Sequence, residues 1–217
     1  MKHEAREENI KRVLKTLGGR YHGQGDTHLG TPEDTLLATL LSARTTDKQT
    51  LAAFPAFRKR FPTWKKLADA DWTEIAETIN TIGLYRQKAK AINKLARMIL
   101  DEYDGRVPST MEDLTRLPGV GRKTASVVLS FVFGTPAIAV DTHVFRITHR
   151  LGWVKGKDAK RVERELMELV PKRLWSEINR VLVPFGRDIC RAPTPQCWRC
   201  PVAQWCAYPN KTEKPKA

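Results

Sequence analysis

The sequence of 217 residues has no cysteine outside one short segment near its C-terminal end, and it has no apolar run of 18 residues. A membrane-spanning helix needs about 20 mostly apolar residues, so we expect no transmembrane segment. The N-terminal residues MKHEAREENIKR are polar and charged, which does not fit a secretory signal peptide. We therefore expect a protein of the reducing cytosol, where disulfide bonds are rare.

Acidic residues are also scarce relative to basic ones. The chain contains 24 Asp and Glu against 38 Lys and Arg, which gives a formal net charge of +14 at pH 7. This excess predicts a polyanionic partner, with nucleic acid as the first expectation and an anionic membrane surface as the second. The length allows one large domain or two small ones with an ample buried core. No internal repeat or low-complexity block is present.

The cysteines that are present follow the spacing C-x6-C-x2-C-x5-C and are Cys190, Cys197, Cys200 and Cys206. Four thiols in one segment indicate a single site with four thiolate ligands, which suits zinc or an iron–sulfur cluster. Structural zinc sites usually combine two separated pairs of ligands, whereas only one Cys-x2-Cys pair exists here. The spacing therefore favours a [4Fe–4S] cluster over zinc, and the expected reducing cytosol disfavours paired disulfides.

Hydrophobic periodicity is helical along nearly the whole chain, which predicts an all-α fold. The apolar spacing from Ile10 to Leu17 predicts a first helix that ends at Gly18-Gly19. Thr31 is the predicted N-cap of the next helix, because a proline follows it at the first helical position. Two capping boxes, Asp71-x-x-Glu74 and Ser109-x-x-Glu112, predict two further helix starts.

Two segments rich in β-branched residues, 127–133 and 137–140, could be strands. The residues from Ala125 to Val132 keep helical spacing, and Gly134 follows as a C-terminal stop, so we predict a helix for the first segment. For the second we predict a short apolar connector that ends at Asp141.

A glycine-rich segment, LPGVGRKTA, lies at residues 117–125 between two predicted helices. Its glycines permit positive φ angles and the close approach of another backbone. The second helix is predicted to begin just after Gly121, where its free N–H groups can bind a phosphate. This hairpin therefore predicts a sequence-independent grip on a DNA backbone. The residues expected to provide it are Leu117, Gly119, Val120, Gly121 and Arg122.

Two residues, one within this segment and the other 18 residues after the first, each have both a simple and a chemical interpretation. Lys123 lies in the first turn of the second helix, where it could contact phosphate or solvent, or could be an amine nucleophile that forms a Schiff base. Asp141 lies in the motif VDTH at residues 140–143, where it could be an N-cap, or could face a cleft and accept a proton or stabilise an oxocarbenium-like sugar. For His143 a structural or phosphate-contacting role is favoured over catalysis.

Taken in order, LPGVGRKTA, VDTH and the cysteine spacing resemble endonuclease III, the helix-hairpin-helix DNA glycosylase with a [4Fe–4S] cluster. The segments LLSARTTD at 40–47 and TIGLYRQKA at 81–89 resemble further blocks of that family, and the likeness extends over roughly residues 30–208. The resemblance implies two helical domains that flank a DNA-binding cleft. These would be a six-helix barrel with the hairpin at 25–135, a cluster domain of 1–24 plus 136–210, and a disordered tail at 211–217.

The resemblance implies a bifunctional DNA glycosylase and abasic-site lyase of base excision repair. Lys123 matches the Schiff-base nucleophile and Asp141 the catalytic aspartate, while the four cysteines match the ligands of the cluster. The implied substrates are oxidised or saturated pyrimidines in double-stranded DNA, together with abasic sites cleaved by β-elimination. Related adenine and mismatch glycosylases generally lack a lysine at this place, so Lys123 favours a bifunctional enzyme. We expect a monomer in the cytoplasm of a prokaryote, associated with the nucleoid.

One position departs from the family pattern, because Arg44 stands where glutamine is common. It resembles the residue that fills the gap left by an extruded base, and Leu84 resembles the partner wedge. Arginine is longer, charged and able to pair with guanine or phosphate, which leaves the opposite-base preference and the substrate range open. Three further residues are expected to contact DNA: His143, Arg187 and Arg191.

Two other functions stay open at this point. A monofunctional mismatch glycosylase would use Lys123 only to bind phosphate, and it would release a base without cutting the strand. A non-catalytic, metal-containing DNA-binding protein would use the hairpin for grip and would turn over no damage. The presence of both Lys123 and Asp141 in a matching context weighs against the second alternative.

Overall fold

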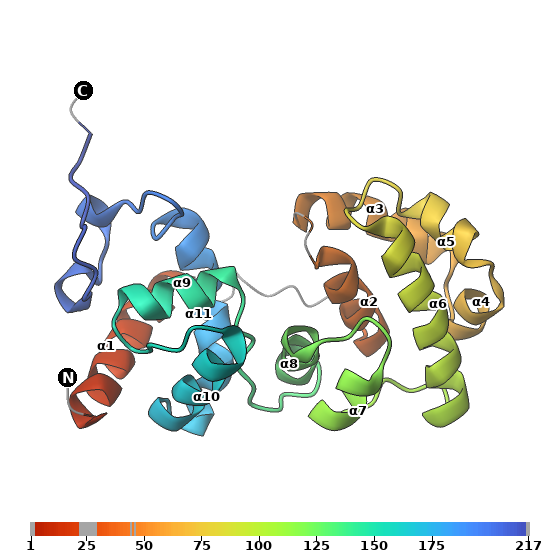
Figure 1. The fold of residues 1–217 in the computed structure, drawn as a ribbon, viewed down its shortest axis with the longest axis horizontal. Coiled ribbons are helices and arrows are strands. Elements are labelled where there is room, and N and C mark those ends of the chain that lie inside the picture. The colour runs from red at the N-terminus through yellow and green to blue at the C-terminus, as the bar shows by residue number, and fades with distance from the viewer. Residues whose placement is uncertain (1–2, 22–29, 44, 46, 216–217) are drawn as a thin grey trace. The chain divides into compact units, whose positions relative to one another are not determined.

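A computed structural model describes residues 3–21, 30–43, 45 and 47–215, which form helices, turns and loops without a strand among them (Figure 1). The predicted all-α fold is confirmed. The chain divides into two compact units, one of Thr27–Gly134 and one of Met1–Asp26 with Thr135–Ala217. Within the described ranges, no helix is both long enough and apolar enough to span a membrane.

The unit Thr27–Gly134 has the long helix α6 as its central support. Helices α4 and α5 pack against α6, while α2 packs against α8. The apolar stripe of α6 from Ile92 to Ile99 is buried, as its spacing predicts. The resemblance implies six helices, whereas the described part of this unit contains seven helical segments. They are α2 (Pro32–Ser42), α3 (Asp47–Arg60), α4 (Trp64–Asp69), α5 (Trp72–Thr78), α6 (Tyr85–Glu102), α7 (Met111–Arg116) and α8 (Arg122–Phe131).

The other unit combines the first helix of the chain with the C-terminal segment. Helix α1 packs on α11, and α11 packs on α9. Its core includes the apolar side chains of Ile10, Leu17, Ile147, Trp153 and Phe185. Its helices are α1 (His3–Tyr21), α9 (Thr142–Arg150), α10 (Ala159–Leu169) and α11 (Trp175–Asp188), with short 3-10 turns η1 (Lys172–Leu174), η2 (Cys197–Arg199) and η3 (Ala203–Trp205).

Several predicted helix boundaries are confirmed. The Thr31 side chain accepts a hydrogen bond from the Asp34 amide at 3.1 Å and caps α2. Both hydrogen bonds of the capping box at Asp71 and Glu74 are present at the start of α5. The segment that could have been a strand belongs to α8 as far as Phe131, and residues 137–140 form an irregular connector.

Two predicted boundaries are wrong. Helix α1 does not end at Gly18-Gly19 but continues to Tyr21, because the Tyr21 ring is buried and its hydroxyl is hydrogen-bonded. Ser109 is not the N-cap of α7. Thr110 takes that place, since its hydroxyl accepts from the Asp113 amide at 3.1 Å and donates to the Asp113 carboxylate at 2.6 Å.

Candidate functional site

The hairpin between α7 and α8 is a tight turn built around a glycine. The Val120 amide donates to the Leu117 carbonyl at 3.0 Å, and Gly119 has a φ of +80°. A proline followed by a residue with positive φ is typical of a type II turn. A Cβ atom on Gly119 would lie 2.9 Å from the Cβ of Ala91 on α6. Both the backbone conformation and the packing therefore require glycine here.

The hairpin residues divide into anchors and an outer surface. The side chains of Leu117 and Val120 are buried, so only their backbone groups are available to a ligand. Gly119, Gly121 and Arg122 are exposed. Gly121 is the N-cap of α8 and offers no side chain to cap it, while a Cβ there would meet nothing within 4 Å. The first N–H groups of α8 therefore suit an external acceptor such as a phosphate.

Lys123 is exposed in the first turn of α8, directly after the hairpin. From Thr124 to Ser130 every residue of α8 is buried, so the helix is fixed by its own packing. A macromolecular ligand that binds the hairpin can therefore reach the Lys123 amine without any rearrangement of the helix.

Asp141 is the N-cap of α9, as one of its two interpretations predicts. Its Oδ1 atom accepts a hydrogen bond from the Val144 amide at 2.7 Å, and the side chain is half-buried. The cap engages Oδ1, which leaves the second carboxylate oxygen outside the capping hydrogen bond. Capping and proton transfer are therefore compatible roles for this residue.

His143 is held by Arg146, a residue that the sequence did not single out. The Arg146 Nη2 atom lies 3.1 Å from His143 Nδ1 and also donates to the Cys190 carbonyl at 2.9 Å. Because a guanidinium group only donates, Nδ1 is assigned as the acceptor and the neutral ring carries its proton on Nε2. This contact supports the structural interpretation of His143, and its predicted contact with DNA stays a prediction.

All four cysteines line a single cavity in the unit that contains α9 and α11, and all four are free thiols. The cavity lining includes no histidine, aspartate or glutamate. Burial raises the pKa of the Cys200 thiol to about 11 and also raises the pKa of Cys206. A bound cation would offset this loss of solvation and favour the thiolate form. Apolar lining residues are Ile147, Leu151, Phe185, Ile189 and Val202.

The four sulfurs lie around one shared cavity and do not converge on a single ion position. Among the described residues, no group of three or more His, Cys, Asp or Glu side chains converges on one ion position. Helix α9 contacts both ends of the cysteine segment, since Arg150 Nη1 lies 3.4 Å from Cys190 Sγ and the Arg150 carbonyl lies 3.3 Å from Cys206 Sγ. Four soft donors spread around one cavity fit the four thiolate ligands that a [4Fe–4S] cluster would need.

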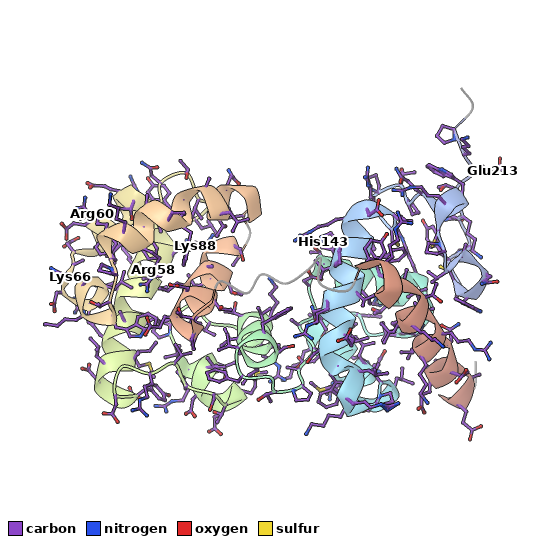
Figure 2. The ribbon with its side chains drawn as sticks, turned by 180° about the vertical axis from the view of Figure 1, so that it is seen from behind. Arg58, Arg60, Lys66, Lys88, His143 and Glu213 are labelled. Carbon is purple, nitrogen blue, oxygen red and sulfur yellow. The ribbon has the colours of Figure 1, made fainter. Side chains whose placement is uncertain are left out.

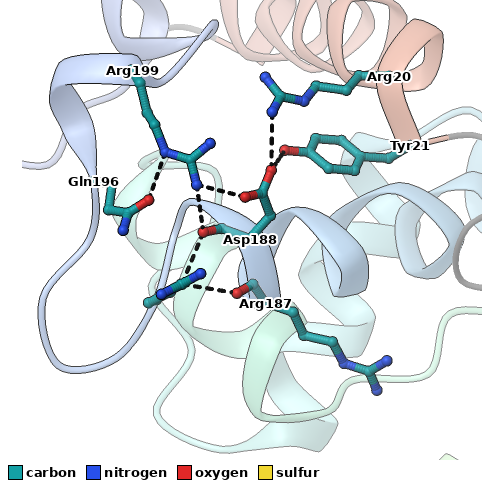
Figure 3. Close-up of polar contacts among 7 residues, drawn as sticks. Arg20, Tyr21, Arg187, Asp188, Gln196 and Arg199 are labelled. Carbon is teal, nitrogen blue, oxygen red and sulfur yellow. Dashed lines mark hydrogen bonds and ion pairs between the residues drawn. The ribbon is translucent and has the colours of Figure 1, made fainter.

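A polar network centred on Asp188 fixes the start of the cysteine segment (Figure 3). Asp188 Oδ2 accepts from the Tyr21 hydroxyl at 2.6 Å and from Arg20 at 3.2 Å, while Oδ1 accepts from Arg199 at 2.5 Å. The hydrogen bonds from Tyr21 and Arg199 lower the pKa of Asp188. The carboxylate therefore joins α1, α11 and η2 just before the first cysteine.

The two arginines predicted to contact DNA here, Arg187 and Arg191, are both exposed. Arg191 Nε donates to the carbonyls of Arg187 and Asp188 at 3.0 and 2.9 Å, so its side chain lies along the last turn of α11. The DNA contacts of both arginines stay predictions.

Thr212 lies within the predicted disordered tail. Its hydroxyl accepts from the Cys197 amide and donates to the Pro195 carbonyl, so the chain is anchored at this point.

Leu84 combines high exposure with an unusual backbone. It is the N-cap residue of α6, its φ of +60° lies in the left-handed region, and its side chain is 46% exposed. This conformation costs about 1–2 kcal/mol for a residue other than glycine, and such strain is typical of functional sites. The role of Leu84 as a wedge stays a prediction. Arg44 lies outside the described residues.

One buried charge was missed by the sequence argument. Lys88 on α6 is only 7% exposed, and burial lowers its pKa to about 8. A signal was present, since Lys88 precedes Ile92 by four residues and therefore falls on the apolar stripe of the helix. Arg146 and Asp188 gave no comparable signal, because each is one charged residue among many on an amphipathic helix.

Both the sequence and the structure are similar to those of known proteins. The profile of the HhH-GPD superfamily of base excision DNA repair proteins matches residues 37–172. The chain is 40% identical to endonuclease III of Thermotoga maritima, over 96% of this chain and 95% of the relative. It is 39% identical to endonuclease III of Bacillus subtilis, over 95% and 96% of the two chains.

Solved structures give the same result. A trapped covalent intermediate of endonuclease III with DNA matches with a TM-score of 0.85 and 38% identity, over 92% of this chain and 95% of that chain. A thermostable thymine-DNA glycosylase matches with a TM-score of 0.83 and 26% identity, over 94% and 97%. The hairpin, the aspartate-capped helix and the cysteine cavity thus occur together in a chain that belongs to the endonuclease III family of helix-hairpin-helix base excision DNA repair proteins.

Proposed function

We propose that the protein is a bifunctional DNA glycosylase and abasic-site lyase in which Lys123 is the nucleophile. The observation that carries this proposal is the exposed amine of Lys123 directly beside a hairpin suited to phosphate. A DNA backbone held at the start of α8 lies close to that amine. A lysine that served only as a phosphate contact would leave the lyase activity of this family without its Schiff-base group.

The reaction begins when the damaged nucleotide is turned out of the duplex. The neutral Lys123 amine attacks C1′ of the deoxyribose, and the N-glycosidic bond breaks with its electron pair going to the departing base. Asp141 accepts a proton and stabilises the positive charge that develops on the sugar. The carboxylate oxygen outside the α9 cap supports this role.

Strand cleavage follows from the covalent intermediate. Opening of the sugar ring gives a protonated Schiff base between Lys123 and C1′. Removal of a C2′ proton then sends electrons toward the iminium nitrogen and expels the 3′ phosphate by β-elimination. Hydrolysis of the Schiff base releases the cut strand and restores the amine.

The proposed substrates are oxidised or saturated pyrimidines and abasic sites in double-stranded DNA. A second candidate is a monofunctional mismatch glycosylase, which the likeness to the thermostable thymine-DNA glycosylase favours. The two differ in one product, because a monofunctional enzyme releases the base and leaves the strand intact. We further propose a monomer that acts on the nucleoid in a bacterial cytoplasm, a setting that fits the bacterial sources of the relatives.

We propose that Cys190, Cys197, Cys200 and Cys206 hold a [4Fe–4S] cluster. The donor set of four thiolates around one cavity supports this assignment over zinc. When bound, the cluster cross-links the cysteine segment and so fixes the neighbouring basic residues for contact with phosphates. The loaded protein is expected to be yellow-brown with broad absorbance near roughly 400 nm. A colourless protein with stoichiometric zinc would reject the cluster.

The test of the lysine role is borohydride trapping on a duplex that carries one thymine glycol. Borohydride reduces a Schiff base to a permanent amine, so the parent protein is expected to become covalently attached to DNA. Lys123→Ala is expected to lose all trapping. Arg122→Ala is the matched control, because it removes a neighbouring positive charge and keeps the amine.

The outcomes separate the candidate functions. Trapping that survives in Lys123→Ala would exclude Lys123 as the nucleophile. A parent protein that releases the base but is trapped neither on thymine glycol nor on an abasic duplex would support the monofunctional glycosylase. Trapping on the abasic duplex alone would keep the lysine chemistry and reject the proposed lesion class.

A further inference from the structure

Lys88 makes contacts at both of its ends. Its Nζ atom donates to the Leu41 carbonyl at 2.7 Å and to Thr45 Oγ1 at 2.9 Å. Its backbone amide donates to the Leu84 carbonyl at 3.0 Å and so closes the first turn of α6. One residue therefore connects the exposed Leu84 to the C-terminal end of α2. Figure 2 shows Lys88 in the interior of its unit, beside α2.

The end of α2 is a place where a cation is favourable. The last carbonyls of a helix have no partner within it and carry partial negative charge. The Leu41 carbonyl belongs to this group, since α2 ends at Ser42. Lys88 thus supplies from α6 a charged hydrogen bond to the end of α2, and Thr45 receives a second one on the far side of the turn that follows.

A lysine that only filled space would not require this arrangement. Burial of the ammonium group is costly, as the lowered pKa of Lys88 indicates. An apolar side chain would occupy the same stripe of α6 without that cost. The charge is used to fix the end of α2 to the turn of α6 that begins at Leu84.

We propose that Lys88 is a positioning residue that braces Leu84 against helix α2 while Leu84 is inserted between base pairs. The inference rests on the proposed function, because it assigns the brace to the base-extrusion step. Insertion displaces Leu84 toward the body of α6. The hydrogen bond from Lys88 Nζ to the Leu41 carbonyl at the end of α2 resists this displacement. A loosened wedge would slow extrusion but would leave the chemistry at Lys123 intact.

The test compares Lys88→Met with the parent on two substrates under single-turnover conditions. The first is thymine glycol paired with adenine. The second is thymine glycol opposite a tetrahydrofuran abasic analogue, where extrusion is easier because the lesion has no partner base. Lys88→Met is expected to release the base about tenfold more slowly from the paired substrate. On the unpaired substrate its rate is expected to equal that of the parent.

Three controls make the comparison specific. Lys94→Met makes the same change at an exposed position of the same helix and is expected to behave as the parent. Lys88→Arg keeps a charged donor and is expected to restore most of the rate. Borohydride trapping on a preformed abasic duplex counts the competent molecules in each preparation, so that a loss of folded protein does not imitate a slower step.

Equal slowing on both substrates, or no slowing on either, would overturn the brace. If Lys88→Met does not fold, Thr45→Val carries the test. It removes one of the two acceptors of the Lys88 ammonium group from a partly exposed position, keeps the Leu41 carbonyl as the other, and should slow only the paired substrate. Failure of the proposed function gives a different result, because the parent itself would then not be trapped on the abasic duplex.

Discussion

The hydroxyl of Tyr21 donates to Oδ2 of Asp188 over 2.6 Å, which ties the last residue of α1 to the last residue of α11. The other carboxylate oxygen of Asp188 accepts from Arg199. The cysteine segment starts at Cys190, two residues after Asp188. One side chain therefore secures the region where the first helix of the chain, the last long helix and the cysteine loop come together.

Asp188→Asn should weaken this junction. The substitution keeps the size of the side chain but removes its charge and replaces one acceptor with a donor, so that the Tyr21 or the Arg199 hydrogen bond is lost. Hydrogen bonds to charged groups contribute about 1.5–3 kcal/mol each. We expect the free energy of unfolding to fall by about 2 kcal/mol in urea titrations. The absorbance of the proposed cluster should also bleach faster in air, and unchanged stability would contradict this role.

Gly119→Ala and Gly121→Ala should separate folding from DNA binding. Alanine at Gly119 would place a Cβ 2.9 Å from Ala91 and would force an unfavourable positive φ, so we expect a clearly lower melting temperature. Alanine at Gly121 meets no protein atom within 4 Å, so the melting temperature should not change.

Affinity for DNA, in contrast to the melting temperature, should be sensitive to the change at Gly121. The Gly121→Ala methyl group lies on the exposed face of the hairpin and obstructs a backbone approaching α8, so affinity for an abasic duplex should fall in fluorescence anisotropy. Normal affinity in Gly121→Ala would show that the DNA backbone does not approach this glycine.

Leu84→Gly should remove the side chain that is proposed to insert between base pairs, and it should also relieve the backbone strain at this position. Glycine adopts the left-handed backbone at Leu84 without the cost of about 1–2 kcal/mol that leucine incurs, so the melting temperature should stay level or rise. Base release from a paired lesion should fall, while strand cleavage at a preformed abasic site should change little. A variant that loses both activities equally would argue against a role confined to extrusion.

Lys88 predicts a pH-dependent difference in stability. Its pKa is about 8 in the folded protein and 10.5 ordinarily, so between these values the unfolded chain binds more protons than the folded one. The penalty for burying the charge is present in full below pH 8 and declines as pH rises toward 10.5. The stability of the parent relative to Lys88→Met should therefore increase between pH 7 and pH 9.5. A difference that stays constant in urea titrations would contradict the lowered pKa.

Much of the fold follows from local rules that act over a few residues. The Thr31 cap, the capping box at Asp71 and the hairpin turn at Gly119 depend on short-range chemistry, and the structure confirms them. The end of α1 was mispredicted because Tyr21 is held by Asp188, a residue 167 positions away. No pattern of neighbouring residues contains that information.

The candidate site divides in the same way. The cap at Asp141 and the exposed start of α8 could be read from the sequence, because each depends on the residues next to it. The brace at Lys88 could not, because the Leu41 carbonyl is a backbone group, and only the packing of α6 near the end of α2 brings it within reach.

The position of α1 also has a consequence for protein synthesis. The unit Thr27–Gly134 is contiguous in sequence, so all of its own packing partners are synthesised in one stretch. The other unit needs α11 as the partner of α1, and α11 is translated long afterwards. The apolar face of α1 therefore has no α11 to pack against until the whole intervening unit has been synthesised.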